Sequence, residues 1–142
     1  FDGNEGTFWS TNAAQAGNEW IRIEFDRVVD VAAVRLFFNA TNPGRNPVQP
    51  GAPRPAARQG IFKQAFRPRG LVIETMSGDT PETSTPFNPL AALMQALLRN
   101  PVQPTMEFWL APNQSRSIII RQTGHSPTDP WSVSELTIWE RK

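Results

Sequence analysis

Six short segments of the chain alternate between apolar and polar residues with a period of two. In the first, Ile21, Ile23 and Phe25 fall on one side of an extended backbone and charged residues fall on the other. The other segments are similarly enriched in β-branched and aromatic residues. Strands of this kind, separated by turn-forming residues, predict an all-β fold, an antiparallel β-sandwich. The segments span 20–25, 31–38, 70–76, 105–110, 116–123 and 134–141.

Residues 88–101 follow a different pattern. Asn88 is a favourable N-cap, Pro89 suits the first helical position, and Asn100-Pro101 ends the element. We therefore expect one short helix over 89–99. Its apolar stripe is expected to pack on the sandwich, and docking onto a partner is the alternative. The stripe consists of Leu90, Leu93, Met94 and Leu97.

Composition limits the remaining possibilities. With 142 residues, 39% of them hydrophobic, the chain fits one domain over 1–142, which we expect to belong to a larger protein. A net charge of +1 gives no general attraction to nucleic acid or to a membrane, and no apolar run is long enough for membrane insertion. The chain has no cysteine, which excludes disulfides and zinc–thiolate sites. The proline-rich stretch 43–58 predicts a long exposed loop insertion.

The first residues, FDGNEGT, gather side chains that bind cations. Asp2, Asn4 and Thr7 offer the oxygen ligands that calcium prefers, and the two glycines allow a tight backbone. The spacing does not fit an EF-hand, because Ala13 stands where the loop-closing glutamate would be. Local chemistry alone leaves two interpretations open, an ordinary Asx-type turn and a calcium loop.

Motifs near both ends of the chain resemble one family. The order D-G-N-x-x-T-x-W at 2–9, the alternating strand from Trp20 and V-A-A-V-R-L at 31–36 are similar to the opening of discoidin domains. These are the coagulation factor type C domains and the related family-32 carbohydrate-binding modules. The closing segments 116–124 and 131–140 also resemble that family. The resemblance covers 2–38 and 116–140, and it implies a jelly-roll sandwich of the galactose-binding type.

The resemblance also implies one structural calcium ion. Carried over to this sequence, the loop ligands correspond to Asp2 and Thr7, with Asn4 where a further oxygen is common. Glu135 corresponds to a carboxylate on the final strand. Two carboxylates would offset the charge of the ion, and backbone carbonyls would complete its shell. The chain departs from the family in lacking a strand before this loop, in its proline-rich insertion and in its helix.

Sugar-binding relatives use loops at one end of the sandwich, where an aromatic ring stacks on the sugar and polar side chains bind its hydroxyls. The candidates by residue type are His125, Arg121, Trp131 and Asn39. Trp131 is expected in a loop, 124–131, before the final strand, and its alternative role is to pack on the sandwich. For His125 the alternative is a solvated turn residue.

No catalytic motif stands out. His125, Ser126 and Asp129 are too close in sequence for a typical triad, and no nucleophile elbow, phosphate loop or dinucleotide fingerprint occurs. We therefore expect a non-catalytic carbohydrate-binding module that targets a larger protein to a glycan or glycoconjugate. The alternative is a structural or protein-interaction domain of the same fold, appended to a bacterial membrane or envelope enzyme such as a glycosyltransferase. The final strands and residues 69–79 resemble discoidin-like domains at the C-termini of bacterial membrane glycosyltransferases, which favours an extracytoplasmic location (secreted, periplasmic or cell-surface) and leaves both functions open.

Overall fold

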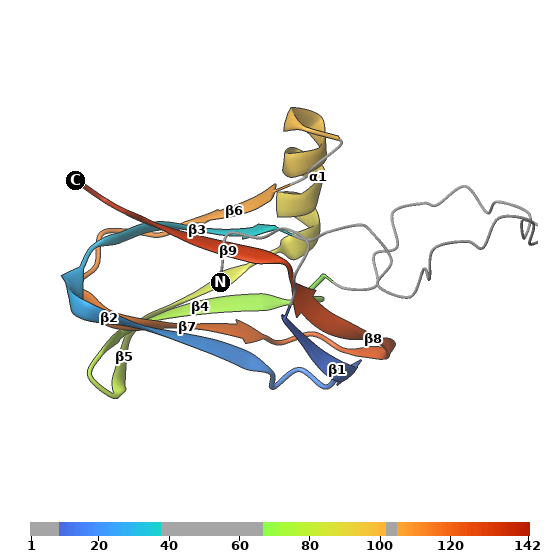
Figure 1. Ribbon diagram of the computed structural model, residues 1–142, viewed down its shortest axis with the longest axis horizontal. Helices are drawn as coiled ribbons and strands as arrows, with labels where there is room; N and C mark the ends of the chain where they lie inside the picture. Colours follow the sequence, from blue (N-terminus) through green and yellow to red (C-terminus); the bar gives the residue numbers. More distant parts are fainter. Residues whose placement is uncertain (1–8, 38–66, 102–104) are drawn as a thin grey trace, which may run out of the picture.

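The computed structural model describes residues 9–37, 67–101 and 105–142 (Figure 1). Within these residues it contains nine strands and one helix. The predicted loop 43–58 lies outside the described residues. In chain order the elements are β1 (Trp9–Gln15), β2 (Trp20–Val29), β3 (Val31–Phe37), β4 (Leu71–Ser77), β5 (Thr80–Phe87), α1 (Pro89–Arg99), β6 (Thr105–Trp109), β7 (Ser115–Gln122), β8 (Ser126–Val133) and β9 (Glu135–Glu140).

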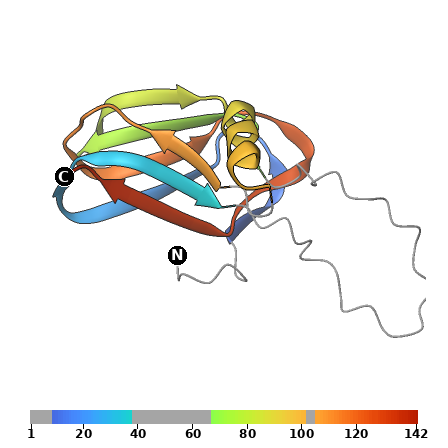
Figure 2. The ribbon, with the colours of Figure 1, turned by 90° about the horizontal axis from the view of Figure 1, so that it is seen from above.

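Two antiparallel sheets form the layers of a sandwich. One has four strands in the order β2-β7-β4-β5, and the other has three in the order β6-β3-β9. Figures 1 and 2 show the two layers facing each other, with α1 standing at one end. A separate ribbon of β1 and β8 lies at that same end. The predicted fold, an all-β antiparallel sandwich with one short helix, is confirmed.

The core lies between the two sheets and follows from the period-two pattern. Along β3, Val34 and Leu36 face inward and are fully buried, while the residue between them faces outward. Ile118 and Ile120 do the same on β7, and Ile73 on β4. The inward side chains of both sheets pack in one cluster, so their apolar surface is removed from water. This burial stabilises the fold by about 25 cal/mol per Å² of apolar surface.

All six predicted strands are present, but three further strands were not predicted. β5 has the sequence TPETSTPF and is exposed along most of its length. β8 occupies residues that we expected to form a loop, so that interpretation of 124–131 was wrong from Ser126 onward. The reason is pairing: β8 is held by β1, which carries little apolar pattern of its own.

The helix begins and ends as predicted. The Asn88 Oδ1 atom accepts hydrogen bonds from the backbone N–H groups of Leu90 (3.0 Å) and Ala91 (3.3 Å), as an N-cap should. Two of the four side chains of the predicted apolar stripe are partly buried, and the other two are exposed. Leu93 packs against the core and Leu97 is half-buried, but Leu90 and Met94 are exposed together with Leu98. The buried residues of α1 are Pro89, at its start, and the small Ala96, whose short side chain lets the helix lie close to the sandwich.

Candidate functional site

Three loops meet at the end of the sandwich where β2 and β4 begin and β7 ends. A Cβ atom at Gly124 would lie 2.3 Å from the Cβ of Arg69, and one at Gly70 would lie 2.6 Å from the Thr123 Oγ1. The Thr123 N–H also donates to the Gly70 carbonyl at 3.1 Å. Glycine is therefore required for the segments 67–70 and 123–125 to approach so closely. We call residues 15–20, 67–70 and 121–129 the loop end.

The β1–β2 turn forms the third part of the loop end. Gly17 has a φ of +88°, which favours glycine, and a Cβ there would lie 3.2 Å from two ring atoms of His125. The Glu19 carboxylate fixes this turn by accepting the N–H groups of Ala16 (2.5 Å), Gly17 (3.0 Å) and Asn18 (3.2 Å). Burial raises the pKa of Glu19, but these backbone hydrogen bonds outweigh it and the pKa lies below its ordinary value.

A buried amide network underlies the three loops. The Gln15 Nε2 atom donates to the carbonyls of Arg67 (3.0 Å) and Pro130 (3.2 Å). The Gln15 Oε1 atom accepts the Arg69 N–H at 3.1 Å and also a short hydrogen bond from the Gln122 Nε2. Since Gln15 is 3% exposed, these bonds are protected from water. One side chain thus links β1, β7, β8 and the segment before β4.

An ion pair closes one side of the loop end. The Arg69 Nη2 lies 2.7 Å from the Asp129 Oδ2, which also accepts the Ser126 hydroxyl at 2.9 Å. Burial raises the pKa of Asp129, but hydrogen bonds from Ser126, Arg69 and Thr128 outweigh it, so the pKa lies below its ordinary value. The carboxylate is therefore ionised and held in place at neutral pH.

Two of the predicted ligand residues lie at the loop end and face solvent, next to a tryptophan. Arg121 pairs directly with Trp20 across the β2–β7 ladder, and its Nη2 lies 3.0 Å from the Glu74 Oε2. Trp20 is 54% exposed. His125 is exposed above the β1–β2 turn. An exposed indole, a guanidinium held by a carboxylate and an imidazole are therefore grouped on one end of the domain.

The other predicted residues have different outcomes. Trp131 is fully buried and packs edge-to-face on Trp9, with ring centroids 5.2 Å apart. Its ring is therefore not accessible to a ligand, and the alternative, that it packs on the sandwich, describes it. Asn39 lies outside the described residues, as do Asp2, Asn4 and Thr7.

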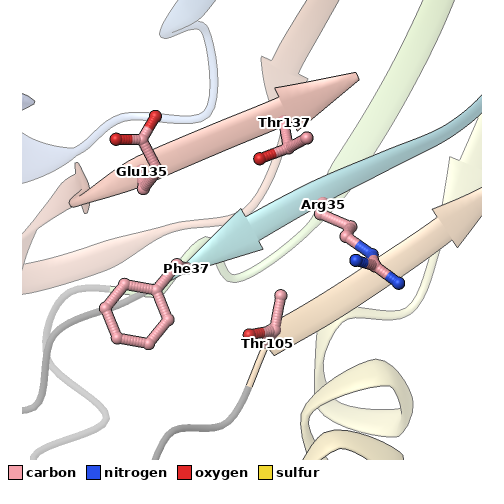
Figure 3. Close-up of a pocket in the computed structure, with 5 residues that line it drawn as sticks. All are labelled: Arg35, Phe37, Thr105, Glu135 and Thr137. Atoms are coloured by element: carbon pink, nitrogen blue, oxygen red, sulfur yellow. The ribbon is translucent and has the colours of Figure 1, made fainter. Parts of the chain in front are cut away.

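Glu135 begins β9 and borders a hollow on the outer face of the three-stranded sheet. The hollow has a volume of about 190 Å³ and is lined by Arg35, Phe37, Thr105 and Thr137 as well as Glu135 (Figure 3). The Glu135 Oε1 accepts the N–H of Leu136 at 3.0 Å, while its Oε2 is buried without a hydrogen-bond partner. Among the described residues, no three acidic, histidine or cysteine side chains gather closely enough to hold a metal ion.

Sequence reasoning missed the four exposed tryptophans of the described residues, although the period-two pattern contained the signal for three of them. Because Ile21 and Ile23 face inward, Trp20 must face outward. The same argument places Trp109 opposite the buried Phe108, and Trp139 opposite Ile138. Trp109 is 57% exposed and Trp139 is 39% exposed. Both lie on the outer face of the three-stranded sheet.

No protein-family model matches this sequence, and no curated protein matches it. Solved structures do. The lectin domain of lectinolysin, complexed with Lewis b antigen, has a TM-score of 0.60 at 13% identity, covering 99% of this chain and 81% of that one. The family-32 carbohydrate-binding module of C. perfringens NanJ, in complex with galactose, has a TM-score of 0.56 at 13% identity, covering 96% and 79%.

A third similar structure is a fucose-binding module from Streptococcus pneumoniae. Its TM-score is 0.57 at 14% identity, and the match covers 99% of this chain and 79% of that one. Identities this low establish the architecture and leave the ligand open. The chain has the galactose-binding-like β-sandwich fold of discoidin domains and family-32 carbohydrate-binding modules.

Proposed function

We propose that this domain is a non-catalytic carbohydrate-binding module that targets a larger protein to a glycan or glycoconjugate. The observation that carries the proposal is the exposed Trp20 beside Arg121 at the loop end, with His125 on the neighbouring loop. Its support from the comparisons is that structures of this fold were solved with Lewis b antigen and with galactose.

The chemistry of these three side chains suits a sugar. An indole face packs on the C–H face of a pyranose ring, and an exposed indole costs little entropy when it is covered. Arg121 offers donors to hydroxyl groups and is already held by Glu74, so less side-chain freedom is lost on binding. The close-packed glycines fix the loops below, so that the site is preorganised.

The same region offers no hydrolytic arrangement. Ser126 donates to Asp129, and the backbone N–H of Asp129 donates back to the Ser126 Oγ at 3.2 Å. In a catalytic triad the serine instead gives its proton to the histidine, and the carboxylate orients that histidine. The Ser126–Asp129 pair therefore stabilises a turn, which supports a binding role.

The test is a glycan array with purified domain, comparing the parent sequence with Trp20→Ala and His125→Ala. We expect a reproducible sugar class whose binding falls at least tenfold in Trp20→Ala. The matched control is Val28→Ala, since Val28 is 42% exposed on the same strand but outside the loop end. A blank array, or equal binding by all the variants, would contradict the proposal.

We also propose a structural calcium ion held by Glu135 and the opening loop. The support is the buried Glu135 Oε2, which has no hydrogen-bond partner, since a buried carboxylate oxygen is stable when a cation compensates it. The resemblance adds Asp2, Asn4 and Thr7 as the remaining side-chain ligands. When bound, the ion would join the opening loop to the start of β9 and stabilise the fold.

Thermal unfolding with and without calcium tests this site. A real site stabilises the fold by about 2.7 kcal/mol at a hundredfold excess of calcium over its Kd. We expect this gain to disappear in Glu135→Gln and to persist in Glu82→Gln, an exposed glutamate of β5. An unchanged melting temperature after chelation and calcium addition would show that the opening loop is only a turn.

A second candidate function rests on the helix. Leu90, Met94 and Leu98 are 47%, 59% and 86% exposed and follow each other at four-residue spacing, so they form one uncovered apolar stripe. This stripe supports the alternative function of a protein-interaction domain, which we propose would be appended to a bacterial membrane or envelope enzyme. At 11 residues α1 is too short to cross a membrane, and the described part of the chain holds no helix that could.

Hydrogen exchange separates the two functions. If α1 docks within a larger protein, its amides exchange more slowly in that protein than in the isolated domain. If the α1 amides exchange equally fast in both and sugar binding is intact, the interaction function is excluded and only the carbohydrate-binding function remains. We propose that the domain lies outside the cytoplasm as part of a larger protein, and fractionation with an antibody against the domain would test that location.

A further inference from the structure

The outer face of the three-stranded sheet carries side chains that neither the loop end nor the core uses. The register of β6, β3 and β9 arranges them in three rows, each crossing the three strands. We call the outward side chains of the first two rows the aromatic face. In strand order β6-β3-β9 the rows are Trp109–Ala33–Trp139, Glu107–Arg35–Thr137 and Thr105–Phe37–Glu135.

The two tryptophans form an exposed pair. Their ring centroids lie 6.4 Å apart at an interplanar angle of 86°, an edge-to-face arrangement. Between them the short Ala33 is only 1% exposed, so the rings close over it. An exposed pair of aromatic side chains on a rigid sheet is typical of a surface that binds a ligand.

Charged side chains beside the pair are already oriented. The Arg35 guanidinium lies 3.5 Å from the Trp139 ring centroid, which is a cation–π contact. Its Nη2 lies 2.6 Å from the Glu107 Oε1, and the Glu107 Oε2 lies 2.8 Å from Arg99 of α1. Two cations thus share one carboxylate. Within the two rows of the aromatic face the charges of Arg35 and Glu107 cancel, so a polyanion gains no net attraction from these rows.

The hollow of Figure 3 continues the aromatic face toward the other end of the strands. Arg35 and Thr137 belong to both, since they line the hollow and form the second row. Thr105 and Thr137 contribute hydroxyl groups to the hollow, and Phe37 contributes its phenyl ring. From Trp109 to Thr105 the aromatic face and the hollow together extend over about 14 Å of strand. It is long enough for more than one sugar ring.

We propose that the aromatic face, with the adjoining hollow, is a second binding surface for a neutral oligosaccharide chain. This inference rests on the proposed glycan-binding function but concerns a different sheet from the loop end. The more exposed Trp109 ring stacks on a sugar C–H face, the part of Trp139 that Arg35 leaves uncovered packs beside it, and Arg35, Glu107 and the threonine hydroxyls bind sugar hydroxyls. Balanced charge selects a neutral chain, and side chains carried on strands keep the surface rigid before binding.

The experiment follows the indole N–H signals of all five tryptophans by NMR. The probe is an equimolar mixture of neutral hexasaccharides of glucose, mannose, xylose and galactose, with a galacturonic acid hexamer as the charged counterpart. We expect the neutral mixture to shift the Trp109 and Trp139 signals saturably. Trp109→Ala should weaken the Trp139 response at least tenfold, while Val28→Ala should not. An unchanged signal from the buried Trp131 shows that each variant is folded.

Each of the other possible NMR results leads to a different conclusion. If Trp20 alone responds to the neutral mixture, the proposed function stands and the second surface is excluded. If only the acidic hexamer shifts Trp109, the neutral-chain assignment is wrong. Shifts that depend on protein concentration without sugar would identify a second copy of the chain as the occupant and overturn the proposal. If no tryptophan responds to any of these sugars, the second surface is excluded, and the glycan array decides the proposed function separately.

Discussion

The loop end and the aromatic face both present tryptophan to solvent, yet they are built in opposite ways. At the loop end, buried side chains such as Gln15 join loop backbones, and glycines bring those loops within contact distance. On the aromatic face the backbone is a regular ladder, and Trp109 and Trp139 are added to its outer surface. Binding geometry and stability are therefore coupled at the loop end, whereas on the aromatic face they can be changed separately.

The largest expected effect is at Gly124. Replacing it with alanine places a Cβ 2.3 Å from the Arg69 Cβ and 2.7 Å from the Gly70 nitrogen, so the loops must separate. We expect a loss of about 3 kcal/mol in the free energy of unfolding, measured by urea denaturation. Gly78→Ala is the control: nothing lies near its Cβ, and its positive φ alone should cost about 1 kcal/mol. Equal losses would mean that the loops are not closely packed.

Gln15→Leu should be the next most destabilising. It leaves the Arg69 N–H and the carbonyls of Arg67 and Pro130 without their buried partner, which should cost about 2 kcal/mol. Gln95→Leu, on the exposed side of α1, is the control and should change stability little. If both variants unfold at the same urea concentration, the amide network does not hold the loop end together.

A smaller effect should appear in the pH dependence of stability. In the folded protein the pKa of Asp129 lies below the ordinary value of 3.8. The stability that the ionised Asp129 carboxylate contributes is therefore fully present above pH 3.8, and it is lost as the pH falls through the folded pKa. Asp129→Asn should therefore be less stable than the parent domain at about pH 6, with the difference shrinking toward about pH 2. Unfolding measured across this range checks the sign, and a difference that grows in acid would contradict it.

The smallest loss of stability is expected for Trp109→Ala on the aromatic face. The side chain is 57% exposed, so its removal should cost only about 0.5–1 kcal/mol, mainly through the edge contact with Trp139. Trp109→Phe, which retains an aromatic ring, should cost less. A loss as large as that of Gly124→Ala would show that the aromatic face supports the fold, and the contrast between the two regions would disappear.

The fold could be predicted from the sequence where strands have one face on the core. The alternation of β2 and β3 is visible because Ile21, Ile23, Val34 and Leu36 must avoid water. β5 gives no such signal, since most of it is exposed on both faces, and as the edge of its sheet it tolerates Pro81 and Pro86. β1 and β8 exist because they pair with each other, which no local pattern encodes.

The candidate site was predictable only in its chemistry. The residue types His and Arg at a loop end were anticipated, and the structure places Arg121 and His125 there. The sequence pattern predicts a loop at Trp131, because the two prolines within 127–130 are unfavourable in a strand. The structure nevertheless forms β8 there, and this strand carries the Trp131 ring into the core. The sequence gives no indication of the role of Gln15, since a single polar residue does not show that three distant segments will converge on its side chain.

The pairing of strands has a consequence for how the chain is made. β1 pairs with β8 and β2 with β7, while β3 pairs with both β6 and β9, so each described strand of the first 37 residues needs a partner that begins no earlier than Thr105. At a synthesis rate of about 5–20 residues per second, those strands wait at least roughly 3 to 14 s for their partners to be translated. Their apolar faces are open to wrong partners throughout that delay. Chaperone demand during translation should therefore fall mainly on the amino-terminal third of this domain.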